Sequence, residues 1–131
     1  MNKLIGNEIA FKTFNFLKVN EAEIEIPQIK GISYREVGED NPGEISEFEN
    51  IKYGISNDVL VLNRKYLDYY KSYTSEEGKT EEYFKLFELD DEYFELFDLH
   101  HIVAEKDSKL KVVLDYTSCG SSEKFRNSVI K

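Results

Sequence analysis

The sequence has a single cysteine, Cys119, among its 131 residues. A disulfide within the chain is therefore excluded, and so is a small secreted domain held together by disulfides. Long apolar runs are also missing. Residues 1–12 contain no stretch that could serve as a signal peptide, and no window approaches the length that spans a bilayer. We therefore expect a soluble, cytoplasmic protein.

Common motifs of enzymes and metal sites are absent too. The chain has neither of the glycine-rich phosphate loops, GxGxxG or GxxxxGK followed by Ser or Thr, and it lacks the CxxC, HxxxH and HExxH spacings. Because no catalytic constellation stands out, we predict a protein that is not an enzyme. We also predict no catalytic residues and no metal ligands, and the sequence identifies no cofactor-binding residues.

Basic residues are few. The 17 Lys and Arg residues against 26 Asp and Glu residues give a net charge of −9. An acidic surface repels the phosphates of nucleic acids and of anionic membranes, so we expect neither as a partner. The hydrophobic content of 40%, with nine Tyr and nine Phe, is enough for the core of one domain and argues against wholesale disorder.

The first part of the chain gives mixed signals. Residues 9–19 fit neither a helical nor a strand period cleanly, and we interpret them as a segment that docks aromatic side chains on the main body. Residues 22–26 alternate strictly and predict a strand that Pro27 ends. We also expect a short strand over residues 31–37 and a turn at residues 41–43.

A helical pattern follows. Apolar residues over 57–71 fall near one stripe, and Ser56 or Asn57 can cap the helix by accepting a free backbone N–H. Asp58 near the start and Lys71 near the end suit the helix dipole. We predict a helix over residues 57–71, ended by a polar loop at 72–80.

Residues 81–90 and 91–100 are near copies of each other, EEYFKLFELD and DEYFELFDLH. One continuous helix would also bring apolar residues together. Two strands are favoured because aromatic residues are dense and alternate with the charged Lys85 and Glu95. Asp90-Asp91 suits the turn between the copies. We interpret them as two adjacent strands in similar environments.

The β pattern continues to the end of the chain. The second strand extends to residue 104, a turn covers 105–108, and residues 109–116 alternate as a further strand. A loop over 117–124 precedes another strand at 125–130. The face of the 109–116 strand that we expect to be buried carries Leu110, Val112, Leu114 and Tyr116.

His100 and His101 are the first candidates for chemistry. On a strand, adjacent side chains point to opposite faces, so these two cannot bind one metal ion from the same side. We expect one histidine to be exposed and the other to be hydrogen-bonded. Cys119 lies in a loop of small polar residues with no readable base to lower its pKa, which disfavours a functional thiol.

Paired carboxylates are a second class of candidate. Acid–base catalysis needs one carboxyl group whose pKa is shifted by burial. The acidic pairs at residues 76–77, 81–82 and 90–92 fall in turns or at strand ends, where we expect them to be solvated.

Two blocks of sequence carry a resemblance. Residues 13–21, TFNFLKVNE, are similar to a T-W-x-W-L-x-V-N opening, with Phe14 and Phe16 where tryptophan is usual. Residues 102–105 (IVAE), 112–118 (VVLDYTS) and 125–127 (FRN) resemble the run I-V-A-E-x-x-S-x-x-x-V-V-x-D-Y-x-S followed by F-x-N. Both blocks, in this order, resemble the SufB/SufD family of iron–sulfur cluster assembly proteins.

The resemblance implies a scaffold-type subunit that has no ATPase activity of its own. It also implies that this fragment holds no cofactor, because the complete family complex handles the iron–sulfur cluster. Such subunits pair with one another and with the ABC-type ATPase SufC, and their core is a right-handed parallel β-helix. We therefore expect an α+β, mainly β fragment, with an N-terminal α+β region at residues 1–80 and the start of the β-helix core at 81–131. Its last strands would leave an open β edge for self-association.

Two alternatives from other classes stay open. The chain could be a stand-alone small β-rich cytoplasmic binding module. It could also be a small metal-binding or thiol enzyme that uses His100, His101 and Cys119.

Overall fold

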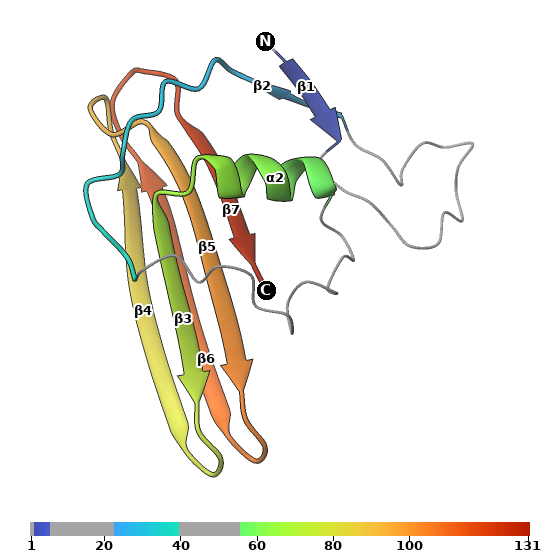
Figure 1. Ribbon diagram of the computed structural model, residues 1–131. Coiled ribbons are helices and arrows are strands. Elements are labelled where there is room, and N and C mark those ends of the chain that lie inside the picture. Colours follow the sequence, from blue (N-terminus) through green and yellow to red (C-terminus); the bar gives the residue numbers. More distant parts are fainter. Residues whose placement is uncertain (1, 6–22, 40–55) are drawn as a thin grey trace.

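The computed structural model describes residues 2–5, 23–39 and 56–131 of the chain (Figure 1). The predicted docking segment at 9–19, the turn at 41–43 and the first resemblance block at 13–21 lie outside the described residues. The described residues form a mainly β fold with one helix, as predicted. Its elements are β1 (Asn2–Ile5), β2 (Glu23–Ile26), α2 (Asn57–Lys65), β3 (Tyr69–Ser75), β4 (Thr80–Leu89), β5 (Glu95–Ala104), β6 (Lys109–Ser118) and β7 (Phe125–Ile130).

From β3 onward the chain alternates between two parallel sheets. One sheet has the strand order β3–β5–β7 and the other pairs β4 with β6, whereas β1 and β2 form a separate antiparallel pair. Tyr69 lies opposite Asp98, Thr80 opposite Lys109 and Glu95 opposite Phe125, so in both sheets the next strand is shifted by 29 or 30 residues along the sequence. Successive turns of chain therefore stack on one another with matching register.

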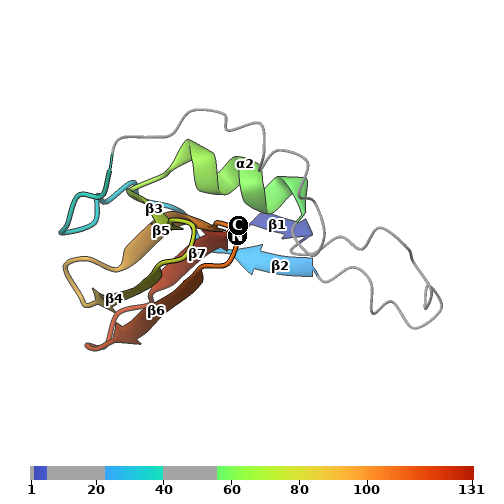
Figure 2. The ribbon, with the colours of Figure 1, turned by 90° about the horizontal axis from the view of Figure 1, so that it is seen from below.

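The layers explain why β5 is the most buried strand. Figure 2 shows α2 on one side of the β3–β5–β7 sheet and the β4–β6 sheet on the other. One core lies between the two sheets and contains Tyr34, Tyr69, Phe87, Leu89 and Leu96. A second core lies under α2 and contains Tyr70, Leu99 and Val129. Because β5 has a packed layer on each face, residues 95–101 are all buried.

The helix is shorter than predicted. Ser56 caps it as expected, since its Oγ accepts the backbone N–H of Val59 at 3.2 Å, but the helix ends at Lys65. The predicted continuation to residue 71 is wrong, because Tyr69 and Tyr70 already belong to β3 and pack into the two different cores. The helix has nine residues, and no helix in the described ranges has the length and the apolar character needed to cross a membrane.

The two near copies at residues 81–100 are strands, as predicted, but they are not adjacent. β4 pairs with β6, whereas β5 pairs with β3 and β7, because the loop at 90–94 carries the chain from one sheet to the other. Their environments also differ. In β4 the apolar Phe84 and Leu86 are exposed, and only its odd-numbered residues face the core.

Most of the remaining predictions of strands and turns are confirmed. The strand ending at Pro27, the turn at 105–108, the strand at 109–116 and the strand at 125–130 are confirmed, with small shifts at their ends. The expected strand over 31–37 is wrong, since this segment has bends and no regular structure. The domain division at residue 80 stays a prediction, although β3 before it pairs with β5 after it.

Candidate functional site

The polar residues Asp98 and His100 lie at the centre of β5 and point into the space between the two sheets. They are two positions apart on the strand, so their side chains share a face. Both are completely buried, with 0% of either side chain exposed. Charged residues are rarely buried without partners, and the surroundings of this pair supply them.

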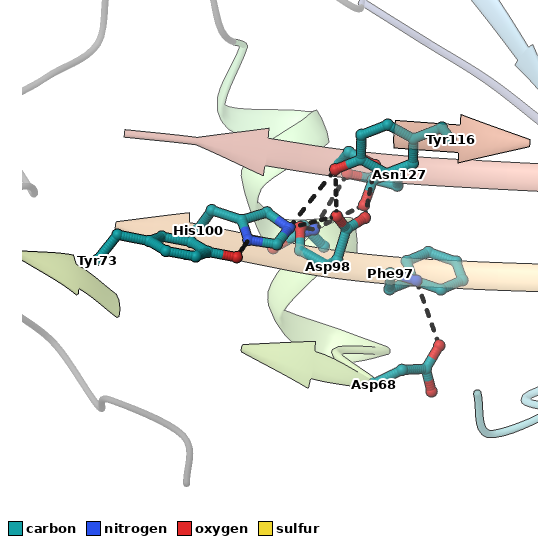
Figure 3. Close-up of polar contacts among 9 residues, drawn as sticks. Asp68, Tyr73, Phe97, Asp98, His100, Tyr116 and Asn127 are labelled. Carbon is teal, nitrogen blue, oxygen red and sulfur yellow. Dashed lines mark hydrogen bonds and ion pairs between the residues drawn. The ribbon is translucent and has the colours of Figure 1, made fainter. Parts of the chain in front are cut away.

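Side chains from three other strands, β3, β6 and β7, form hydrogen bonds with this pair (Figure 3). The Oδ2 atom of Asp98 lies 2.6 Å from His100 Nε2 and accepts the Tyr116 hydroxyl, also at 2.6 Å. Its Oδ1 atom accepts the hydroxyl of Ser128. On the other side of the imidazole, His100 Nδ1 lies 3.0 Å from the Tyr73 hydroxyl. We call these five residues the Asp98 network.

The Asp98 network has a structural role, since its hydrogen bonds connect the buried Asp98 and His100 with side chains of other strands. Burial, reinforced by the charge of Asp98, raises the pKa of Tyr116 well above its usual range, and burial does the same to the pKa of Tyr73. Both phenols therefore stay protonated, and the Tyr116 hydroxyl keeps donating to Asp98. Since β3, β5, β6 and β7 each contribute a member, the network joins both parallel sheets and the successive turns of chain that stack in them, an arrangement that we call the parallel coil.

His101 points to the opposite face of β5, toward α2. It is 3% exposed, and its Nδ1 atom lies 3.2 Å from the Tyr70 hydroxyl. Burial, helped by the positive charges of Lys131 and Arg64, lowers the pKa of His101 to about 4. The expectation that one histidine would be exposed is wrong, because α2 covers the face that would otherwise meet solvent.

Cys119 lies in the loop between β6 and β7, as predicted, and is exposed. In residues 25–39 and 56–131 no three His, Cys, Asp or Glu side chains are grouped so that they could hold a metal ion. His100 and His101 face away from each other, so the structure does not bring the three candidate residues into one site. The predictions that the chain has no metal ligand and no catalytic residue stay predictions.

The acidic pairs were expected to be solvated, and Asp91 indeed keeps 53% of its side chain exposed, but two members of the pairs also have a structural role. Asp91 Oδ1 accepts the Ser122 backbone N–H at 2.8 Å and the Lys124 ammonium at 3.0 Å. Hydrogen bonds from the side chain and the backbone of Ser122, together with the one from Lys124, hold the pKa of Asp91 far below its usual range. Asp90 forms an ion pair with Arg35. They fix the loops at 90–94 and 119–124, and neither has the raised pKa of a general acid.

Two carboxyl groups that the sequence reasoning missed hold residues 30–32 and the start of β5. Glu95, 4% exposed, accepts backbone N–H groups from Lys30, Gly31 and Ile32 at 2.7, 3.0 and 3.2 Å. Asp68 accepts the Phe97 N–H at 3.2 Å (Figure 3). Burial and repulsion from Glu95 and Asp98 raise the pKa of Asp68 to about 6.

A sequence signal for these residues exists. Asp98 and Glu95 are acids inside a strand rich in Leu, Phe, Ile and Val, and an acid at such a place needs internal donors. Apart from His100, their hydrogen-bond partners come from positions 18 to 65 residues away, which no local pattern indicates.

Asp98 and His100 thus lie in a buried interior where their polar groups have hydrogen-bond partners within the chain, and not in an open cleft. Comparison with known proteins adds nothing to this picture, since no family model, no curated protein and no solved structure matches the chain.

Proposed function

We propose that the chain is a non-catalytic, scaffold-type subunit of iron–sulfur cluster assembly, similar to the SufB/SufD family. The observation that supports this most is where the resemblance falls. The block at residues 102–105 covers the end of β5 and the residue after it, residues 112–118 form most of β6, and residues 125–127 begin β7. The block that resembles the start of a β-helix core thus spans consecutive strands of a parallel coil.

The fold that we propose in full is the first part of a right-handed parallel β-helix. Parallel pairing with a regular shift of 29 or 30 residues, from Tyr69–Asp98 to Glu95–Phe125, is the pattern that such a coil needs. The buried interior suits a scaffold, because the polar groups of the Asp98 network form hydrogen bonds with one another and thereby hold the stacked strands together.

The proposed partners are a second SufB/SufD-like subunit and, in the complete assembly, a SufC-like ATPase. The iron–sulfur cluster is then the cargo of the assembly. In the described part of the chain, β6 and β7 each have a strand neighbour on one side only. Ile130 at this end is 48% exposed. An unpaired edge with exposed apolar residues can take a strand from a partner subunit or from another copy.

A proline at residue 130 tests this role of the open edge. The N–H of Lys131 donates to His100 of β5, and that of Phe125 donates to Phe94, just before β5. Because parallel strands alternate their hydrogen bonds, the N–H of Ile130 points away from β5. Ile130→Pro should therefore remove a donor from the free edge and keep the β5–β7 bonds, whereas Ile130→Val is the matched control.

The experiment is co-expression of the 131-residue chain with SufB-like and SufD-like subunits, followed by affinity purification and light scattering. We expect a stable complex with one of them, or a mass that rises with concentration, and loss of either in Ile130→Pro but not in Ile130→Val. A strict monomer that binds neither subunit contradicts the proposal.

A further inference from the structure

A groove of about 400 Å³ runs beside β4, on the side away from β6. Residues 34–36 line one side of it, and Phe84, Lys85, Leu86 and Glu88 line the other. Phe84 is 68% exposed and Leu86 is 42% exposed, although large apolar side chains are usually buried. Val113 of β6, directly opposite Phe84, is 37% exposed and extends the same apolar surface.

The backbone of β4 along this groove is an unpaired strand edge. In the described residues β6 is the only strand that pairs with β4. Hydrogen bonds to β6 and its flanking residues use odd-numbered carbonyls, those of Lys79 and Leu89, so the even-numbered N–H and C=O groups point into the groove. Glu88 bears this out, because its N–H donates to the Tyr34 hydroxyl at 3.0 Å and its carbonyl accepts from the same hydroxyl at 3.4 Å.

Tyr34 closes one end of this edge, and the segment around it is tied down independently. Glu36 forms an ion pair with Lys85, and Arg35 forms one with Asp90. Residues 34–36 are therefore a fixed wall and not a strand. Between this wall and β4, no described strand pairs with the backbone groups of Glu82, Phe84 and Leu86. Such an edge can add a strand, with backbone hydrogen bonds supplying affinity and alternate side chains supplying specificity.

β6, which already pairs with the other edge of β4, indicates which side chains a strand bound in the groove would carry. There Lys111 lies opposite Glu82, and Val113 lies opposite Phe84. Glu82 is exposed, and the chain as a whole carries a charge of −9, so a basic residue is again the complementary choice.

We propose that this groove binds an extended segment of a partner protein as an added strand beside β4. The segment alternates basic residues with β-branched or aromatic residues, so that a basic side chain meets Glu82 and an apolar one meets Phe84. This docking site is separate from the open edge of β6 and β7 and does not depend on the family assignment.

The test uses a fluorescently labelled peptide with the sequence of residues 109–117, KLKVVLDYT, titrated with the 131-residue chain by anisotropy. We expect saturable binding that weakens about tenfold in Phe84→Thr, because an exposed apolar contact is lost while β propensity is kept. Glu82→Gln should weaken binding roughly twofold to fivefold and reduce its salt dependence. Glu77→Gln, an exposed charge in the turn before β4, is the matched control and should bind normally.

Two further arms make the outcome decisive. A peptide N-methylated at alternate backbone nitrogens cannot pair with the edge, so in one of the two alternate sets methylation should abolish binding; binding that survives both sets rejects strand addition. Ile130→Pro should bind the peptide like the unmodified chain. Binding that is lost in Ile130→Pro but kept in Phe84→Thr would place the peptide on β6 or β7 and overturn the proposal, as would no binding up to about 1 mM.

Discussion

The Oδ2 atom of Asp98 lies 2.6 Å from the Nε2 atom of His100, and neither side chain has any exposed surface. A buried pair of this kind is stable only while each partner satisfies the other, because removing one leaves polar groups without water or hydrogen bonds. The coil therefore depends on a polar centre and not on apolar packing alone.

Replacing Asp98 should be among the most damaging single changes. Asp98→Ala leaves His100, Tyr116 and Ser128 without their common acceptor, and we expect the free energy of unfolding in urea to fall by about 3–5 kcal/mol. Asp115→Asn changes an exposed acid on β6 and should shift it by less than about 0.5 kcal/mol. Equal effects of the two substitutions would remove the special role of Asp98.

Glu95 should hold residues 30–32 against the sheet. A glutamine has one acceptor oxygen and no charge, so Glu95→Gln cannot serve all three N–H groups of Lys30, Gly31 and Ile32. We expect a loss of about 1.5–3 kcal/mol and faster hydrogen exchange at those three amides. Glu92→Gln, an exposed change in the neighbouring loop, is the control, and unchanged exchange in Glu95→Gln speaks against this contact.

His101 should make the protein less stable in acid. Its pKa is near 6.5 when unfolded and about 4 when folded, so the unfolded chain binds more protons between these values. The stabilisation is complete above pH 6.5 and is lost as the pH falls toward 4, by about 3 kcal/mol. His101→Phe should remove this part of the dependence in urea melts at pH 4 to 7. Identical pH profiles for the two proteins would show that His101 titrates normally.

Asp68 should have the opposite effect from His101 and make the protein more stable in acid than at neutral pH. Its pKa is raised to about 6 in the folded state, from 3.8, so the folded chain binds more protons than the unfolded chain in this window. Stability is therefore greatest below pH 3.8 and is lost as the pH rises through 6. Asp68→Asn keeps an acceptor for Phe97 and should raise stability at pH 7 by up to about 3 kcal/mol while flattening the profile. A lower stability at pH 7 with an unchanged profile would count against the raised pKa.

Local sequence patterns predicted strands well and pairing poorly. Alternation over residues 109–116 and the cap at Ser56 depend on neighbours in the chain, and both appear in the structure. Whether residues 81–90 pair with residues 91–100 depends on the direction of the loop at 90–94, which local periodicity does not encode. The same limit explains why Phe84 and Leu86, apolar and alternating, lie on the exposed face.

The candidate site shows a similar division. The opposite orientation of His100 and His101 follows from strand geometry and was predictable. Their common burial was not, because it requires α2 on one face of β5 and the β4–β6 sheet on the other. The role of Asp98 depends in the same way on Tyr116 and Ser128, which reach it from other strands.

The most direct test of the parallel coil, on which both functional proposals rest, is an engineered disulfide between β4 and β6. Phe84 and Val113 are opposite each other on an outward face. Neighbouring strands are about 4.8 Å apart, within the range of about 4.4–6.8 Å that a disulfide spans. In a Cys119→Ser background, Phe84→Cys with Val113→Cys should oxidise rapidly and nearly completely, as measured by mass spectrometry of the linked peptides. Thr74→Cys with Val113→Cys, which lie in different sheets, should not link. Failure of the 84–113 pair, or equal linking of both pairs, would contradict the coil.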